Sequence, residues 1–261
     1  MTTTPGTASG DFPGKPPVVD LATWEAARAE LLLREKAHTR EGDAIAAARR
    51  RLPRVELDGT VKVTGADGPV PFLDLFQGRD ELVVYQHMWH DGAPHQGQCE
   101  GCTTTAWHLR DAVYLNARGV SCAVLTTGPW TEVAPYVAFM GYTQPWYSVR
   151  GVAAPIGGGM GHLVSFLREG DRLFLTYSTT GRGNEVVNGS LGLLDMTPYG
   201  RGEEWEDNPE GYLPESRPAC WYWRSDAGGA ATWGPTSRPV PQWTRPGATP
   251  VETLGRHGHH H

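Results

Sequence analysis

The sequence predicts an α/β fold in which a mixed sheet is flanked by helices. Between residues 82 and 140, two short apolar segments typical of buried strands alternate with two segments of helical periodicity. Two further strand-like segments, 163–167 and 173–177, then follow each other directly. The 33 glycines and 21 prolines among 261 residues make turns abundant, which disfavours an all-helical bundle.

The N-terminal part predicts a flexible arm followed by a helix. Residues 1–20 are rich in Thr, Gly and Pro, as mobile chain ends commonly are. Residues 21–54 form a helical segment with apolar residues near helical spacing, and either Asp20 or Thr23 is expected to cap its start. The arginines at 49–51 suit a helix C-terminus, because cations there complement the helix dipole.

The main domain is predicted over residues 55–200. Alternating apolar residues at 55–57 and 61–63 flank Asp58-Gly59, a pair that predicts a hairpin turn. Segment 82–85 is apolar throughout, as expected of a buried central strand.

The second half of this domain continues the same alternation. We expect a helix over 103–118, a second buried strand over 120–125, and a helix that begins near Pro129 and ends at Gly141. Segments 163–167 and 173–177 are expected to form the final hairpin.

The pattern changes near residue 200. Residues 201–248 spread tryptophans among Pro and Gly without periodicity, and we expect an irregular extension whose indoles pack on the domain. Residues 249–261 form a tail with terminal histidines like those of an expression tag, so we exclude it from the site.

Composition and charge limit the classes of molecule that we expect the protein to bind. A net charge of −6 disfavours a nucleic-acid partner, which usually requires a basic surface. No apolar run is long enough to cross a membrane, and the first residues do not resemble a secretory signal. We therefore expect a cytoplasmic protein with a small-molecule substrate, such as a thiol, and no membrane partner; the oligomeric state is open.

The cysteines point to redox or metal chemistry. Cys99 and Cys102 form a Cys-x-x-Cys pair, whereas Cys122 and Cys220 are isolated. In a chain without an evident secretory signal, this pattern favours a reactive or metal-binding pair over a disulfide framework.

Three histidines lie in the same short window as this pair. The window contains His87, His90, His95, Cys99 and Cys102. One hypothesis is dithiol–disulfide chemistry, since a helix starting at about Cys102 directs its positive dipole end at the sulfurs and lowers a thiol pKa.

The other hypothesis is a metal site formed by the same side chains. Thiolates and imidazoles together suit copper or zinc. Glu100 disfavours a thiolate beside it, and extra imidazoles are superfluous for disulfide exchange, so these residues favour the metal.

Several segments resemble one known family, and the resemblance covers roughly residues 20–245. The matching segments are His87–His90, Gln98–Thr103, Phe139–Tyr142, Pro145–Ser148, Tyr177–Gly183, Leu194–Thr197, Tyr199–Arg201 and Gln242-Trp243. The chain resembles the His-rich branch of the thioredoxin-like domain-of-unknown-function family 899, predicted mainly to be dithiol–disulfide oxidoreductases. The resemblance implies a thioredoxin-like fold with an N-terminal helix.

One position departs from ordinary thioredoxins. They place a cis-proline before the final hairpin, where this chain has Gly161-His162-Leu163. We infer that His162 faces the cysteines, as in thioredoxin folds of the Sco type, which bind copper through two cysteines and a distant histidine.

These observations predict an oxidoreductase. Cys99 and Cys102 are the predicted catalytic pair, and together with His87, His90, His95 and His162 they are the predicted ligands of copper. The expected activity is a copper-dependent oxidase or oxygenase acting on a small molecule. The alternatives are metal-free dithiol–disulfide exchange through Cys99 and Cys102, a non-catalytic copper-binding module, and structural zinc.

Three residues are predicted to bind substrate. Tyr85 and Trp89 are expected to line a pocket, and Arg182 to hold an anionic group through its guanidinium. The alternative for Arg182 is a buried ion pair with Glu185 or Asp195.

Overall fold

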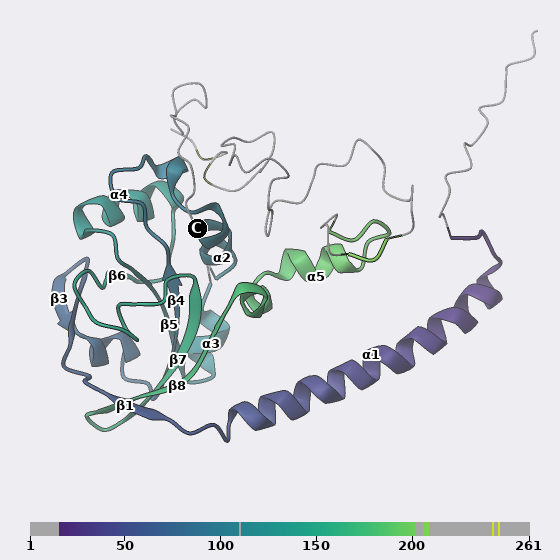
Figure 1. Cartoon of the computed structure of the whole chain (residues 1–261), viewed down its shortest axis with the longest axis horizontal. Helices are drawn as coiled ribbons and strands as arrows, with labels where there is room; N and C mark the ends of the chain where they lie inside the picture. Colours follow the sequence, from purple (N-terminus) through teal and green to yellow (C-terminus); the bar gives the residue numbers. More distant parts are fainter. Residues whose placement is uncertain (1–15, 110, 202–205, 209–241, 243–244, 246–261) are drawn as a thin grey trace, which may run out of the picture. The chain divides into compact units, whose positions relative to one another are not determined.

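A computed structural model describes residues 16–109, 111–201, 206–208, 242 and 245 (Figure 1). The chain divides into two compact units, which we describe separately. One comprises Met1–Arg51 and Leu194–Cys220, and the other Leu52–Leu193 and Trp221–His261. Within the described residues, no helix is long and apolar enough to span a bilayer.

The first unit contains the long helix α1, Leu21–Arg49. The Oδ1 atom of Asp20 accepts a hydrogen bond of 2.8 Å from the Thr23 backbone N–H, which confirms Asp20 as the N-cap. The helix ends at Arg49, within the basic cluster that predicted its C-terminus.

The second unit contains a mixed sheet with eight strands in its described part. The strands are β1 Val55–Leu57, β2 Lys62–Gly65, β3 Gly68–Pro71, β4 Glu81–His87, β5 Val120–Thr126, β6 Trp146–Ser148, β7 His162–Glu169 and β8 Arg172–Thr180. Their order across the sheet is β1-β8-β7-β4-β5-β6-β2-β3.

Helices α2, α3 and α4 lie between these strands along the chain, and α5 follows the last of them (Figure 1). The α-helices are α2 Glu100–His108, α3 Val113–Ala117, α4 Trp130–Met140 and α5 Gly189–Asp195. The short 3-10 helices are η1 Phe72–Phe76, η2 His95–Gly97 and η3 Gly181–Val187.

The central strands have the thioredoxin topology. Strand β4 pairs in parallel with β5 and antiparallel with β7, and β7 forms an antiparallel hairpin with β8. The chain order of the α-helices and strands from β4 to β8 is β4, α2, α3, β5, α4, β6, β7, β8. This arrangement confirms the predicted thioredoxin-like α/β fold.

The two faces of β4 contribute to different parts of the core. Because side chains alternate along a strand, Leu82 and Val84 lie on one face and Tyr85 on the other. Tyr85 shares its cluster with Cys102 and Tyr136, so this face of the sheet packs against the cysteine helix.

Two predicted elements differ from the structure. The hairpin at Asp58-Gly59 is wrong, because β1 pairs with β8 whereas β2 pairs with β3 and β6. Asp58 instead makes a local turn, in which its Oδ1 accepts the Thr60 N–H at 2.8 Å.

The predicted helix over 103–118 is also wrong as a single element. It is divided into α2 and α3, and α2 begins earlier than expected, at Glu100. Asp111 lies just before α3, where its Oδ1 accepts the Val113 N–H at 2.8 Å and so favours a new helix start.

The remaining predicted elements of the domain are confirmed, including β4, β5, α4 and the β7–β8 hairpin. Helix α4 ends where Gly141 adopts a left-handed conformation at φ 65°, the usual termination by glycine. Most of the predicted extension over 201–248, Cys220, the first 15 residues and the tail 249–261 lie outside the described residues.

Candidate functional site

The two cysteines lie at the start of α2, after the loop that leaves the end of β4. Cys99 is the N-cap residue of α2, and its Sγ accepts a hydrogen bond from the Cys102 backbone N–H at 3.4 Å. Cys99 is half-buried and Cys102 only 3 % exposed; both are free thiols. Of the two cysteines at this helix start, Cys99 is therefore the more exposed residue and Cys102 the more buried one.

The surroundings of the two thiols shift their pKa values in opposite directions. The pKa of Cys99 is lowered, chiefly by the hydrogen bond with the Cys102 side chain and also by the backbone N–H groups of Cys102 and Gly101. Burial and the Glu100 charge oppose this shift, so the predicted effect of Glu100 is present but outweighed. The pKa of Cys102 is raised well above its usual value, mainly by burial.

Two groups of the β4 end contact the inner sulfur. The Met88 backbone N–H donates to Cys102 Sγ at 3.4 Å. The Tyr85 side chain also hydrogen-bonds Cys102, and Tyr85 itself is only 3 % exposed. Tyr85 thus contacts the inner thiol and is absent from the lining of the pocket described below, and its role in substrate binding stays a prediction.

His87 belongs to the protein core. It is fully buried, with Trp146 and Tyr136 at ring-centroid distances of 5.1 and 5.7 Å. Burial lowers its pKa to about 3, so the imidazole is neutral at physiological pH. His87 thus shares the inward face of Tyr85, and its predicted role as a metal ligand stays a prediction.

A chain of hydroxyl groups connects His87 to the cysteine helix. Thr103 Oγ1 donates to the Cys99 carbonyl oxygen at 2.8 Å and lies 2.7 Å from the Tyr136 hydroxyl. The Tyr136 oxygen in turn lies 3.5 Å from His87 Nε2, at the limit of a hydrogen bond. These contacts fix the first turn of α2 against β4 and α4.

The other predicted ligands lie in different surroundings. His95 belongs to η2 and packs on Phe139 of α4 at 4.9 Å between ring centroids, and burial lowers its pKa. His162 begins β7 and pairs through Nδ1 with the Ser178 hydroxyl at 3.2 Å. The backbone of His90 is held by the Gln98 side chain through two hydrogen bonds of 3.0 Å.

The six predicted ligands are not assembled into a metal site. In the part of the chain that the structure describes, no three His, Cys, Asp or Glu side chains are arranged to hold a metal ion. The predicted site residues His87, His90, His95, Cys99, Cys102 and His162 all fall within that part. The copper centre stays a prediction.

The segment before Cys99 is held from a distant point in the sequence. Gln242 is fully buried, and its Nε2 donates to the carbonyl oxygens of Gln96 at 3.1 Å and Gln98 at 2.9 Å. The sequence indicated Gln242 only as part of the family resemblance. Its contact was hidden because 144 positions separate it from Gln98.

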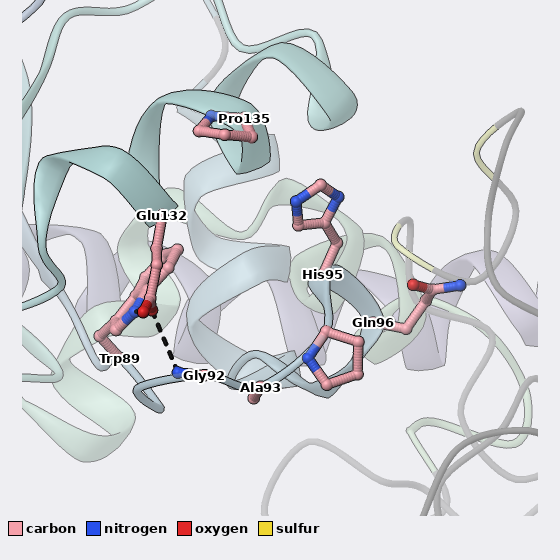
Figure 2. Close-up of a pocket in the computed structure, with 8 residues that line it drawn as sticks. Trp89, Gly92, Ala93, His95, Gln96, Glu132 and Pro135 are labelled. Carbon is pink, nitrogen blue, oxygen red and sulfur yellow. Dashed lines mark hydrogen bonds between the residues drawn. The ribbon is translucent and has the colours of Figure 1, made fainter.

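A pocket of about 360 Å³ lies between this loop and α4 (Figure 2). It is lined by Trp89, Gly92, Ala93, Pro94, His95, Gln96, Glu132 and Pro135. Glu132 Oε2 accepts hydrogen bonds of 3.1 Å from both the Trp89 indole N–H and the Gly92 backbone N–H. Trp89 thus lines a pocket as predicted. Glu132 was not among the predicted site residues. The one sequence signal near it was the predicted helix start at Pro129, which placed Glu132 in the first turn of that helix.

Arg182 forms an ion pair with one of the two partners predicted as its alternative, Glu185, although the arginine side chain is exposed rather than buried. Its Nε donates to Glu185 Oε1 at 2.8 Å, with the Arg182 side chain 54 % exposed. Asp195, the other predicted partner, instead receives two hydrogen bonds from Arg201, at 2.6 and 2.7 Å.

Comparison with known proteins gives one family match. The model of a family described as "Bacterial protein of unknown function (DUF899)" matches residues 13–228. No curated protein matches the chain.

Solved structures with some likeness include two thiol-related proteins. One is the crystal structure of peroxidoxin BcpB from Mycobacterium tuberculosis, with 19 % identity, a TM-score of 0.36, and coverage of 54 % of this chain and 91 % of that one. Another is a putative thiol:disulfide interchange protein DsbE from Chlorobium tepidum, with 14 % identity, a TM-score of 0.37, and coverage of 54 % and 97 %. With TM-scores this low, neither likeness bears on function.

Proposed function

The chain belongs to the DUF899 family, and from the geometry of its two cysteines we propose that it is a dithiol–disulfide oxidoreductase with Cys99 as the attacking thiol. One observation carries the proposal. At the N-terminus of α2, a half-buried thiol with a lowered pKa precedes a buried thiol with a raised pKa. This asymmetry suits an outer nucleophile and an inner resolving thiol.

The proposed reaction is an exchange in two steps. The Cys99 thiolate attacks one sulfur of a disulfide RS–SR, forms a mixed disulfide with it and expels RS⁻, which leaves as a thiol after protonation. Cys102 then loses its proton, its sulfur attacks Cys99 Sγ, and the second RS⁻ leaves and is protonated. The protein loses two electrons and two protons, and the substrate gains them as two thiols.

The surrounding groups support these two roles. Backbone N–H groups of Cys102 and Gly101 stabilise the Cys99 thiolate. The Met88 N–H and the Tyr85 side chain contact Cys102 and oppose part of the rise in its pKa, which favours its deprotonation in the second step. The Cys102 N–H lies 3.4 Å from Cys99 Sγ, so the two residues are held together before the reaction.

The proposal is tested by single-turnover reaction of the reduced protein with bis(2-hydroxyethyl) disulfide. The wild type should release two equivalents of 2-mercaptoethanol and form a Cys99–Cys102 disulfide. Cys102→Ser should stop at the mixed disulfide, detected on Cys99 by mass spectrometry, and Cys99→Ser should react far more slowly than wild type.

A matched control is Cys122→Ser, since Cys122 is a buried thiol of β5 whose pKa burial raises to about 11. This variant should react like wild type. A Cys99→Ser protein that exchanged at the wild-type rate, or a Cys102→Ser protein without an adduct on Cys99, would refute the assignment.

A further inference from the structure

The pocket beside the cysteines has features of a recognition site for one end of a substrate. Its walls come from two elements, the loop of residues 89–96 and the N-terminal half of α4 (Figure 2). The His95 ring packs on Phe139 of α4, which joins the two walls. Pro94 and Pro135 add apolar surface to the lining.

The pocket lies close to the reacting thiol along the chain. Gln96 lines it, and Cys99 follows three residues later. Consecutive Cα atoms are 3.8 Å apart, so the Cα atoms of these two residues are separated by about 11 Å at most. One short segment of chain therefore carries both the pocket lining and the reacting thiol.

Glu132 gives the pocket its charge. It is the one acidic or basic side chain of fixed charge among the lining residues. Nearby Arg150 is paired with Asp91 through hydrogen bonds of 3.0 and 2.7 Å and also interacts electrostatically with Glu132, so these three side chains together carry one net negative charge. Burial lowers the pKa of His95, which leaves the imidazole neutral at pH 7 and without a competing positive charge.

The two oxygens of Glu132 differ in their contacts. Both hydrogen bonds from the loop, from Trp89 and Gly92, end on Oε2. Oε1 accepts no hydrogen bond from the described residues and is available as an acceptor. A carboxylate oxygen that is the one charged acceptor of the lining favours a cation with hydrogen-bond donors over a neutral or anionic group.

We propose that this pocket binds the protonated primary amine of a small disulfide substrate, with Glu132 Oε1 accepting a hydrogen bond from the ammonium group. The assignment of the amine to a disulfide rests on the proposed function. The apolar part of the lining, which includes Pro94 and Pro135, contacts the carbon chain of the substrate, while its sulfur reaches Cys99.

Glu132→Gln is a specific test of this role. The amide oxygen of glutamine can accept both bonds that now end on Oε2, so the loop is retained. The amide NH₂ replaces Oε1, which removes the negative charge and offers a donor where the ammonium group needs an acceptor. Loss of amine recognition can thus be separated from loss of loop structure.

The experiment compares three disulfides of different charge under single-turnover conditions. They are cystamine, which is cationic, bis(2-hydroxyethyl) disulfide, which is neutral, and 3,3′-dithiodipropionate, which is anionic. Wild type should react with cystamine about tenfold faster than with the neutral compound, and slowest with the anion. In Glu132→Gln the cystamine rate should fall about tenfold, with the neutral rate within twofold of wild type.

Asp171→Asn is the matched control, because it removes one negative charge at the exposed β7–β8 turn, away from the pocket. It should leave the preference for cystamine unchanged. If it weakens the preference as much as Glu132→Gln does, the general negative charge of the protein explains the selectivity and the proposal is overturned.

A binding measurement separates this inference from the proposed function. The Cys99→Ser/Cys102→Ser protein is titrated with cystamine by calorimetry, and we expect heat of binding. This heat should be lost when Glu132→Gln is introduced into the same protein. If no disulfide is reduced but this binding occurs, the exchange reaction fails and the amine site stands. If the protein reduces the three disulfides at equal rates, and Glu132→Gln changes neither these rates nor the binding of cystamine, the amine site fails.

Discussion

Replacing Gln242 by methionine tests whether a distant residue holds the segment that leads into Cys99. Methionine has nearly the same volume as glutamine but no donor, so the change removes the two hydrogen bonds to the Gln96 and Gln98 carbonyls with little change in packing. Each lost bond costs about 1 kcal/mol, so the free energy of unfolding should fall by about 2 kcal/mol. The loss can reach about 4 kcal/mol if both carbonyl oxygens stay buried without a replacement partner.

Two measurements check this prediction. Urea unfolding should show the lower free energy of unfolding, and alkylation of Cys99 by iodoacetamide should become faster as the segment opens locally. Gln144→Met supplies the graded control, since Gln144 is also buried but donates a single bond, to the Ala106 carbonyl at 2.9 Å. It should cost about half as much, about 1 kcal/mol, and leave Cys99 alkylation unchanged. The reasoning is refuted if Gln242→Met is as stable as wild type and Cys99 reacts no faster.

Further predictions concern the thiol, the buried histidine, the Trp89 wall and metal dependence. The alkylation rate of Cys99 should reach half its maximum at a pH below the ordinary pKa of a thiol, because the thiolate persists to lower pH. The profile in Cys102→Ala should move upward, because alanine cannot supply the side-chain hydrogen bond that is the main cause of the lowered pKa. The pKa of His87 is about 3 in the folded protein and 6.5 in the unfolded chain. The contribution of the neutral imidazole to the free energy of unfolding is therefore complete above pH 6.5 and is lost as the pH falls toward 3. Urea unfolding of His87→Leu from pH 6 to 4 should therefore show a pH slope shallower than that of wild type by about 1.4 kcal/mol per pH unit; an equal slope contradicts the buried neutral imidazole. Gly128→Ala should displace Trp89, since the added Cβ would lie 2.5 Å from the indole, and should reduce cystamine selectivity with the Cys99 alkylation rate unchanged. Disulfide exchange should be the same before and after treatment with a chelator, measured alongside elemental analysis; loss of exchange restored by copper would favour the oxidase hypothesis instead.

Local signals predicted the central elements of the fold. Strands β4 and β5 are apolar runs, and α4 is bounded by Pro129 and Gly141. The pattern of apolar residues and the residues at the helix ends were therefore enough to predict these elements. The failures involve partners distant in the sequence. Asp58-Gly59 is a genuine turn signal, but pairing between β1 and β8 was not visible in the residues near it.

The candidate site was predictable in its cysteines and not in its histidines. Cys-x-x-Cys between a strand and a helix is a local pattern, and its geometry follows from the helix start. The density of histidines does not specify where each imidazole points. His87 follows the alternation of β4 into the core, whereas His95 packs on α4 through a contact that the sequence does not reveal.

Strand β4 divides two tasks between alternate positions. Leu82 and Val84 support the core on one side of the sheet, while Tyr85 and His87 pack beneath and beside the cysteine helix on the other. A substitution at an odd-numbered position therefore alters the environment of the thiols with limited effect on the opposite core. Within the seven residues of β4, the side chains that set the surroundings of the thiols lie on one face, and those that support the core of the sheet lie on the other. Residues on the first face can therefore change, and alter the redox properties, without disturbing the second.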